Sequence, residues 1–194
     1  GLADGFFVIP YTLGGYLAGN RLEAAADSDP EFRRAADESG LKFKRLLSVK
    51  GRKTPSEFHR RLGEVMWNEC GMARNEAALK RALVKIPEIR EEFRENLAVG
   101  GGAEELNQTL ERAGKVADFI DFAELLVRDA LERRESCGGH FREESCTPEG
   151  EAKRDDAGFS HAAVWEHAGE GKAPLLNKEA LAFEHIKPSE RSYK

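Results

Sequence analysis

Residues 133–144 read Arg-Arg-Glu-Ser-Cys-Gly-Gly-His-Phe-Arg-Glu-Glu, and this stretch decides where the helical part of the chain ends. Charged side chains surround two adjacent glycines, a residue type that ends helices and lets the backbone approach another surface closely. The stretch follows a long amphipathic run and precedes a tail punctuated by glycine and proline. Such dense charge, on a helix end beside a flexible turn, either docks against a partner or supports a site. We therefore divide the chain here, with a helical domain over 27–135 and a C-terminal tail over 136–194.

Three segments before this stretch have the periodicity and the end signals of amphipathic helices. The first begins with the capping box Thr54-Pro55-Ser56-Glu57 and ends near Cys70, where Gly71 suits a left-handed cap. Asn75 caps the second helix. The third covers residues 103–134, where apolar residues keep close to a 4-3 alternation. The short links between these segments predict a mainly α fold, an antiparallel three-helix bundle.

Two further expectations concern which side chains of the helical domain face its core. A helix over about 30–49, started by Asp27-Ser28-Asp29-Pro30, is expected to turn five residues inward: Phe32, Ala36, Phe43, Leu46 and Leu47. In the longest segment Leu106 begins the apolar seam, and Glu124 fills its one gap.

The two ends of the chain differ from this helical domain. Residues 1–26 are apolar and aromatic, and we expect them to form a helix that closes another domain. A first helix tucked onto the bundle is the alternative. In the tail, Phe159–Trp165 and Lys178–Ile186 resemble two short strands, which predicts an extended arm or a short β-hairpin. Because the opening residues lack a helix start signal, we expect the chain to be the C-terminal piece of a larger protein.

Composition excludes several classes of protein. The 194 residues carry a net charge of −5, which argues against non-specific binding to nucleic acid. No apolar run reaches the length of a membrane span. The three cysteines are an odd number without regular spacing, which indicates a reducing cytosol rather than a disulfide scaffold.

The residues that could carry chemistry do not form a recognisable site. Cys137, His140 and Cys146 are close in sequence, but a structural zinc site needs four ligands with recurring short spacings. His140 could transfer protons, yet the sequence has no phosphate-cradling glycine loop and no nucleophile elbow. We therefore expect no catalytic, cofactor-binding or metal-binding residues in this chain, and a hydrogen-bonded His140 at a helix end.

Several motifs taken together resemble a known family. They include a Met-Trp…Gly-x-x-Arg turn over 66–75 and, over 134–143, an Arg-Glu-Ser-Arg-Gly-Ala-His-x-Arg-x-Asp signature. Cys137 and Gly139 depart from that signature, and a glutamate replaces its aspartate. Residues 1–11, Lys153-Arg154-Asp155-Asp156 and the final Arg191–Lys194 also fit. The chain thus resembles the C-terminal part of the flavoprotein subunit of succinate dehydrogenase and fumarate reductase.

This resemblance implies an oxidoreductase whose intact subunit interconverts succinate and fumarate and passes electrons through FAD to an iron-sulfur subunit and quinone. In this family the residues that hold FAD and the dicarboxylate lie upstream of the region matched here. The resemblance therefore implies that this piece alone binds no cofactor and is inactive.

It also implies the partners of the chain and its place in the cell. The partners are the N-terminal FAD-binding part, the iron-sulfur subunit and, indirectly, the membrane anchor subunits. The complex would be peripheral, on the cytoplasmic side of the cell membrane. By the same resemblance a structural docking role falls to five residues of the charged stretch: Arg134, Glu135, Ser136, His140 and Arg142.

Two alternatives remain at this stage. L-Aspartate oxidase shares much of the family's architecture, so the chain could be the C-terminal domain of such a flavoenzyme. A free-standing helical interaction module without chemistry is the other reading.

Overall fold

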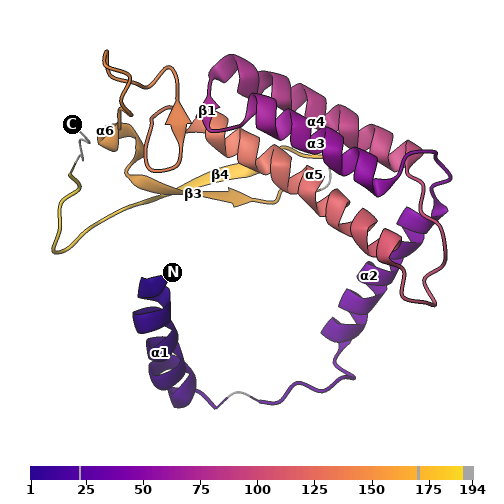
Figure 1. The fold of residues 1–194 in the computed structure, drawn as a ribbon. Coiled ribbons are helices and arrows are strands. Elements are labelled where there is room, and N and C mark those ends of the chain that lie inside the picture. The colour runs from indigo at the N-terminus through magenta and orange to yellow at the C-terminus, as the bar shows by residue number, and fades with distance from the viewer. Residues whose placement is uncertain (22, 170, 190–194) are drawn as a thin grey trace. The chain divides into compact units, whose positions relative to one another are not determined.

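The computed structural model describes residues 1–21, 23–169 and 171–189 (Figure 1). Two compact units are present, Gly1–Leu41 and Lys42–Lys194. The C-terminal motif Arg191–Lys194 lies outside the described residues. No described helix is both long enough and apolar enough to cross a membrane.

The first unit contains a helical segment with no buried side chain. π-Helical turns over Asp4–Val8 (η1) and Thr12–Leu17 (η2) flank the short α-helix α1 (Ile9–Tyr11). All residues from 1 to 21 are exposed, although the segment is rich in large apolar side chains.

Helix α2 (Pro30–Ser48) buries only Leu46, close to its C-terminal end. The expectation of five inward-facing residues holds for Leu46 and for the partly buried Leu47, which packs against the core. It was wrong for Ala36, Phe32 and Phe43, which are exposed, Phe32 to 54% and Phe43 to 40%. The apolar periodicity of this helix was read correctly, but a stripe becomes buried only where another element covers it.

Helices α3 (Pro55–Glu69), α4 (Glu76–Asn96) and α5 (Gln108–Glu132) pack on one another in the second unit (Figure 1). The mainly α fold is thereby confirmed. Their inward-facing side chains form one hydrophobic core, whose fully buried members include Phe58, Leu79, Ile86, Ile89, Val116, Ile120 and Val127.

The ends of these helices follow the predicted signals with two exceptions. Thr54 forms the predicted capping box, and Asn75 caps α4. Helix α5 begins later than expected, because Asn107 accepts a hydrogen bond from the backbone N–H of Leu110 and caps it. Leu106 therefore lies before the helix and is 91% exposed, so its predicted place in the seam was wrong.

Gly71 is required for a reason other than the one predicted. Its backbone is not left-handed, since the described glycines with positive φ are at 101, 138, 150, 169 and 171. A Cβ at Gly71 would instead lie 2.6 Å from the carbonyl oxygen of Trp67. The glycine thus allows the chain to pass close to the last turn of α3.

The tail contains a hairpin that is tied to α5. After a short helix α6 (Asp156–Phe159), strand β3 (His161–Glu166) pairs antiparallel with β4 (Leu175–Ala180). The second strand begins three residues before the predicted position. The indole N–H of Trp165 donates to Asp129 at 2.8 Å, and Lys178 pairs with Glu132 at 3.0 Å.

Candidate docking site at the end of helix α5

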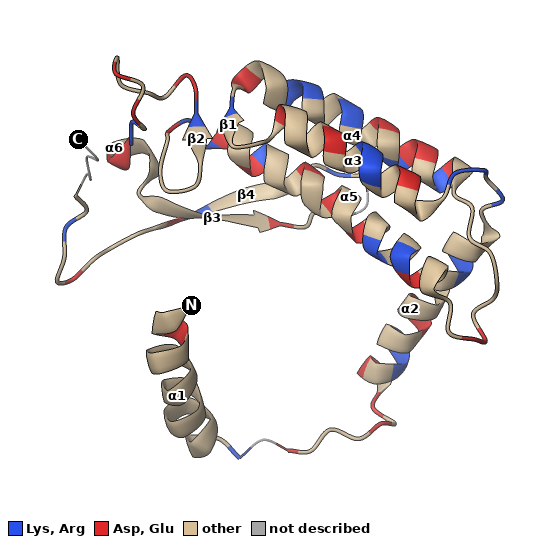
Figure 2. Cartoon of the chain, viewed as in Figure 1, with Lys and Arg blue, Asp and Glu red and all other residues tan. Residues whose placement is uncertain are grey.

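The charged stretch forms a junction between two connections of the helical unit. Strand β1 (Ala73–Arg74), which lies between α3 and α4, pairs in parallel with β2 (Phe141–Arg142), which follows α5. The backbone N–H of Glu143 extends this pairing by donating to the carbonyl of Arg74 at 2.9 Å. Figure 2 shows charged residues gathered where β1 and β2 meet.

Arg142 is buried at the C-terminal end of α5. Only 3% of the residue is exposed, and its Nη1 donates to the carbonyl oxygens of Ala130 at 3.0 Å and Leu131 at 3.3 Å. The last carbonyls of a helix lack partners within the helix and carry partial negative charge. The guanidinium therefore satisfies these carbonyls and ends α5.

Glu144 connects this helix end to the start of α4. One carboxylate oxygen accepts from Nε of Arg142 at 3.1 Å, and the other accepts from the backbone N–H of Glu76 at 2.6 Å. Burial acts to raise the pKa of Glu144, but the hydrogen bonds from Glu76 and Arg142 outweigh it and lower the pKa. The ionised carboxylate thus caps α4 and anchors Arg142.

Glu135 and Ser136 hold the tail against the junction from within. The Ser136 hydroxyl accepts from the backbone N–H of Arg142 at 2.8 Å and lies 3.1 Å from the carbonyl oxygen of the same residue. Glu135, only 2% exposed, pairs with Arg133 at 2.7 Å and accepts from the backbone N–H of Asp155 at 2.8 Å.

His140 is half-buried and hydrogen-bonded on both sides of its ring. Its Nδ1 lies 2.9 Å from Nη1 of Arg74, and its Nε2 lies 2.8 Å from the carbonyl oxygen of Arg133. Burial lowers the pKa of His140, and the charges of Arg74, Arg142 and Arg133 lower it further against the opposing hydrogen bond to the Arg133 carbonyl.

The five predicted docking residues therefore fall into two groups. Glu135, Ser136, His140 and Arg142 come together in the junction and bond to other parts of the same chain. Arg134 is exposed, and its side chain makes no hydrogen bond or ion pair with any other described residue. The neighbouring turn at Gly138-Gly139 is exposed too, with Gly138 at a φ of 59°.

The sequence did not reveal the two partners that complete this junction. Arg74 and Glu144 lie 70 residues apart in the chain, and only the β1–β2 pairing brings them to the same place. The Gly-x-x-Arg turn singled out Arg74, but its contact with His140 had no local signal.

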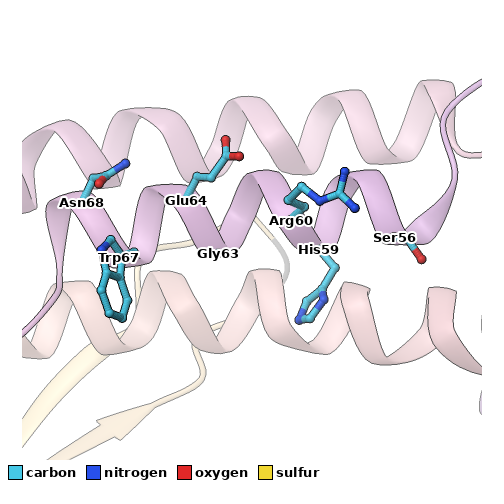
Figure 3. Close-up of a pocket in the computed structure, with 7 residues that line it drawn as sticks. All are labelled: Ser56, His59, Arg60, Gly63, Glu64, Trp67 and Asn68. Carbon is cyan, nitrogen blue, oxygen red and sulfur yellow. The ribbon is translucent and has the colours of Figure 1, made fainter.

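Two surface hollows are lined by described residues, the second of them beside the junction. One, of about 670 Å³, runs along the exposed side of α3 over Gly63 (Figure 3). Figure 3 shows His59 and Trp67 on one side of that helix and Glu64 and Asn68 on the other. The second hollow, of about 170 Å³, lies between the junction and the tail and is bordered by Arg133, Cys137, Arg154, Phe159, Phe183 and other residues.

The cysteines have separate surroundings. Cys70 is buried, and this burial raises the pKa of its thiol. Cys137 and Cys146 are half-buried, and all three thiols are free. Within residues 1–21, 23–169 and 171–189, no group of three or more His, Cys, Asp or Glu side chains could hold a metal ion.

Comparisons with known proteins show one family match and several relatives. The family model described as "Fumarate reductase flavoprotein C-term" matches residues 59–193. A fumarate reductase flavoprotein subunit of Haemophilus influenzae is 24% identical over 187 residues, which cover 96% of this chain and 30% of that protein. A succinate dehydrogenase flavoprotein subunit of Bacillus subtilis is 24% identical over 93% of this chain and 31% of its own.

Solved structures share the fold. The FrdA chain of an Escherichia coli quinol fumarate reductase variant superposes with a TM-score of 0.69 at 22% identity, over 90% of this chain and 28% of its own. The chain thus spans less than a third of the length of these relatives.

Proposed function

Because the chain belongs to the fumarate reductase flavoprotein C-terminal family, we propose that it is the C-terminal helical part of a flavoprotein subunit that interconverts succinate and fumarate. The family match over residues 59–193 carries this proposal, since it covers most of α3, all of α4 and α5, and the whole junction. Electrons would pass from the substrate through FAD to an iron-sulfur subunit and then to quinone.

FAD is assigned to the flavin-bearing part of the subunit and not to the helical bundle formed by α3, α4 and α5. A dinucleotide pyrophosphate binds at a free helix N-terminus preceded by a glycine turn. The N-termini of α3, α4 and α5 are each capped by a side chain of this chain, from Thr54, Asn75 and Asn107. These helix ends do not fit a pyrophosphate, so no catalytic step is assigned to them.

The residues of the junction are assigned a structural docking role. Glu135, Ser136, His140 and Arg142 would fix the shape of the charged stretch from inside, as their hydrogen bonds to one another and to Ala130 and Arg133 support. Arg134 and the turn at Gly138-Gly139 would contact the flavin-bearing part of the subunit or the iron-sulfur subunit. An exposed arginine suits this role because its planar guanidinium pairs with carboxylates through two parallel hydrogen bonds.

The domain organisation follows from the same proposal. Residues 1–26 would form the closing helix of the FAD-binding domain, which accounts for their exposed apolar side chains. Residues 27–135 would form the helical domain, with α3, α4 and α5 as an antiparallel three-helix bundle, and residues 136–194 the tail. The complex would be peripheral, on the cytoplasmic side of the membrane and held there by anchor subunits.

An activity assay on the complete subunit tests the proposal. We expect a yellow, FAD-containing protein that oxidises succinate with a dye acceptor and reduces fumarate with a reduced viologen. L-Aspartate serves as the control substrate and should not be oxidised. A folded but colourless protein, or one that oxidises L-aspartate in place of succinate, would contradict the proposal.

The docking role has a separate test in the same complete protein. Arg134→Glu should reduce co-purification of the iron-sulfur subunit or loosen the flavin-bearing part towards limited proteolysis. Arg60→Glu, a charge reversal of an exposed arginine on α3, is the matched control. Assembly and protease resistance that are equal in both variants and the wild type would remove Arg134 from the docking surface.

A further inference from the structure

We propose that His140 is a proton-sensitive latch, which holds the α3–α4 connection against the end of α5 when neutral and loosens this junction when protonated. The proposal rests on the geometry of the ring and its neighbours, and it does not depend on the proposed activity.

The hydrogen bonds of the ring define its protonation state. A guanidinium can only donate and a carbonyl can only accept. Nδ1, at 2.9 Å from Nη1 of Arg74, must therefore be the unprotonated acceptor. Nε2, at 2.8 Å from the carbonyl oxygen of Arg133, must carry the proton. The bonded state is thus the neutral Nε2–H tautomer.

The charged groups around the ring come from three elements. Arg74 faces it from β1, Arg133 from the end of α5, and Arg142 from β2 on its own segment. The nearby carboxylates are engaged elsewhere: Glu135 with Arg133, Glu144 with Arg142 and α4, and Glu143 with Asn75. Within the part of the chain that the structure describes, no carboxylate forms an ion pair with His140.

Protonation would act on one side of the latch. A proton on Nδ1 removes the acceptor for Arg74 and places two positive charges at hydrogen-bonding distance, whereas the Nε2 bond to Arg133 survives. The ladder between β1 and β2 is only two residues long on each strand. The bond between His140 and Arg74 adds to the few other contacts there, namely the short ladder, the Glu143–Asn75 hydrogen bond and the Glu144 cap on α4. Its loss therefore weakens the hold on the α3–α4 connection rather than on the end of α5.

The sign of the pH effect follows from linkage. Burial holds the pKa of His140 below its usual value of 6.5. The unfolded chain therefore takes up the proton first as the pH falls, which favours unfolding. The stabilisation by neutral His140 is complete above about pH 6.5 and is lost as the pH falls through the lowered pKa.

Substitution by glutamine provides the test. In His140→Gln the side-chain oxygen can accept from Arg74 and the amide nitrogen can donate to Arg133 at every pH. We expect the urea midpoint of the wild type to fall between pH 7.5 and pH 5, and His140→Gln to lose most of that fall. His185→Gln is the matched control, since that side chain is 83% exposed, and it should follow the wild type. A pH dependence in His140→Gln equal to that of the wild type would overturn the proposal.

A second measurement does not depend on a variant that folds. Two-bond ¹H–¹⁵N spectra of the imidazole ring report its tautomer and its titration directly. We expect the Nε2–H tautomer of His140 at pH 7.5 and a midpoint below 6.5. A ring that carries its proton on Nδ1 at pH 7.5, or one whose titration midpoint is 6.5 or above, would refute the latch.

Discussion

At the scale of single residues, the buried guanidinium of Arg142 has the most consequences for this chain. It replaces solvent at the end of α5, pairs with Glu144 and supports β2. A buried cation is tolerated only when its donors are satisfied.

We predict that Arg142→Ala lowers the free energy of unfolding by about 2–4 kcal/mol, because buried carbonyls and a carboxylate lose their partner. Arg134→Ala, eight residues earlier and exposed, is the control and should leave the denaturation midpoint near that of the wild type. Urea unfolding of both variants measures the difference. Equal midpoints would show that solvent can replace Arg142 at the helix end.

At the scale of elements, ion pairs on the flank of the core join α3 and α4. Glu92 on α4 pairs with Arg61 on α3 and with Lys53 just before α3. Glu69, at the end of α3 and 8% exposed in its side chain, pairs with Arg81 at 2.8 Å and with Lys85, both on α4. The two clusters lie towards opposite ends of α4, so together they restrain how these helices slide and rotate against each other.

The Glu92 cluster predicts an acid-sensitive contribution to stability. Hydrogen bonds from Lys53 and then Arg61 lower the pKa of Glu92 from 4.5 to about 2. The contribution is therefore present above about pH 4.5 and is lost as the pH falls towards 2. Because both cations are partly exposed, we expect only on the order of 1 kcal/mol.

Glu92→Gln should thus be less stable than the wild type at pH 6, with a difference that shrinks by pH 2.5. Glu88→Gln, an exposed substitution on the same helix, is the control and should show no such trend. Thermal unfolding of the wild type and both variants at the two pH values measures this difference in stability. A constant difference across this range would exclude the titration of Glu92 as its source.

Gly51 and Gly63 lie in opposite surroundings, one against backbone and the other on open surface. A Cβ at Gly51 would lie 1.9 Å from the backbone carbon of Asn96, where the loop before α3 crosses the end of α4. A Cβ at Gly63, on the exposed side of α3, would meet no atom within 4 Å.

Gly51→Ala should therefore prevent this crossing and destabilise the chain strongly, whereas Gly63→Ala should stabilise it by about 0.5–1 kcal/mol through helix propensity. Thermal unfolding of the two variants and the wild type measures both changes in stability. A neutral Gly51→Ala would mean that the backbone at Asn96 moves aside at little cost.

Local signals were read from the sequence more reliably than contacts over distance. The capping box at Thr54 and the cap at Asn75 involve neighbours within three residues, and both form as predicted. Leu106 fits the apolar alternation, but Asn107 offers a stronger start for the helix and leaves Leu106 outside. Glu124 stands at the gap in the apolar seam, where its carboxylate pairs with Arg90 of α4 at 2.6 Å. The two residues are 34 positions apart, so no local sequence pattern could have predicted this ion pair.

The candidate site shows the same limit. The sequence singled out the charged stretch but treated its arginines alike, and only the fold distinguishes buried Arg142 from exposed Arg134. Which arginine is buried depends on the pairing of β1 with β2, since this pairing places Arg142 under the last turn of α5. Strands of two residues, such as β1 and β2, form because of tertiary contacts rather than because of their own β-propensity.

At the scale of the whole molecule, the apolar side chains of residues 1–21 are exposed within their own unit. Phe6 and Phe7 are each 73% exposed, and Leu2, Tyr11 and Tyr16 are exposed to a similar degree. Soluble proteins rarely present such contiguous apolar surface unless it is an interface. The proposed function supplies an occupant for this surface, the flavin-bearing part of the subunit.

The 194-residue chain by itself should therefore self-associate through this segment. We predict that sedimentation velocity detects dimers or larger species at micromolar concentration, and that the double variant Phe6→Ser/Phe7→Ser shifts the distribution towards monomer. Leu106→Ser is the control, because it removes an equally apolar side chain that is 91% exposed but lies outside the segment. If the wild-type chain is monomeric, or if the double variant associates as the wild type does, residues 1–21 are not the uncovered interface that the proposal requires.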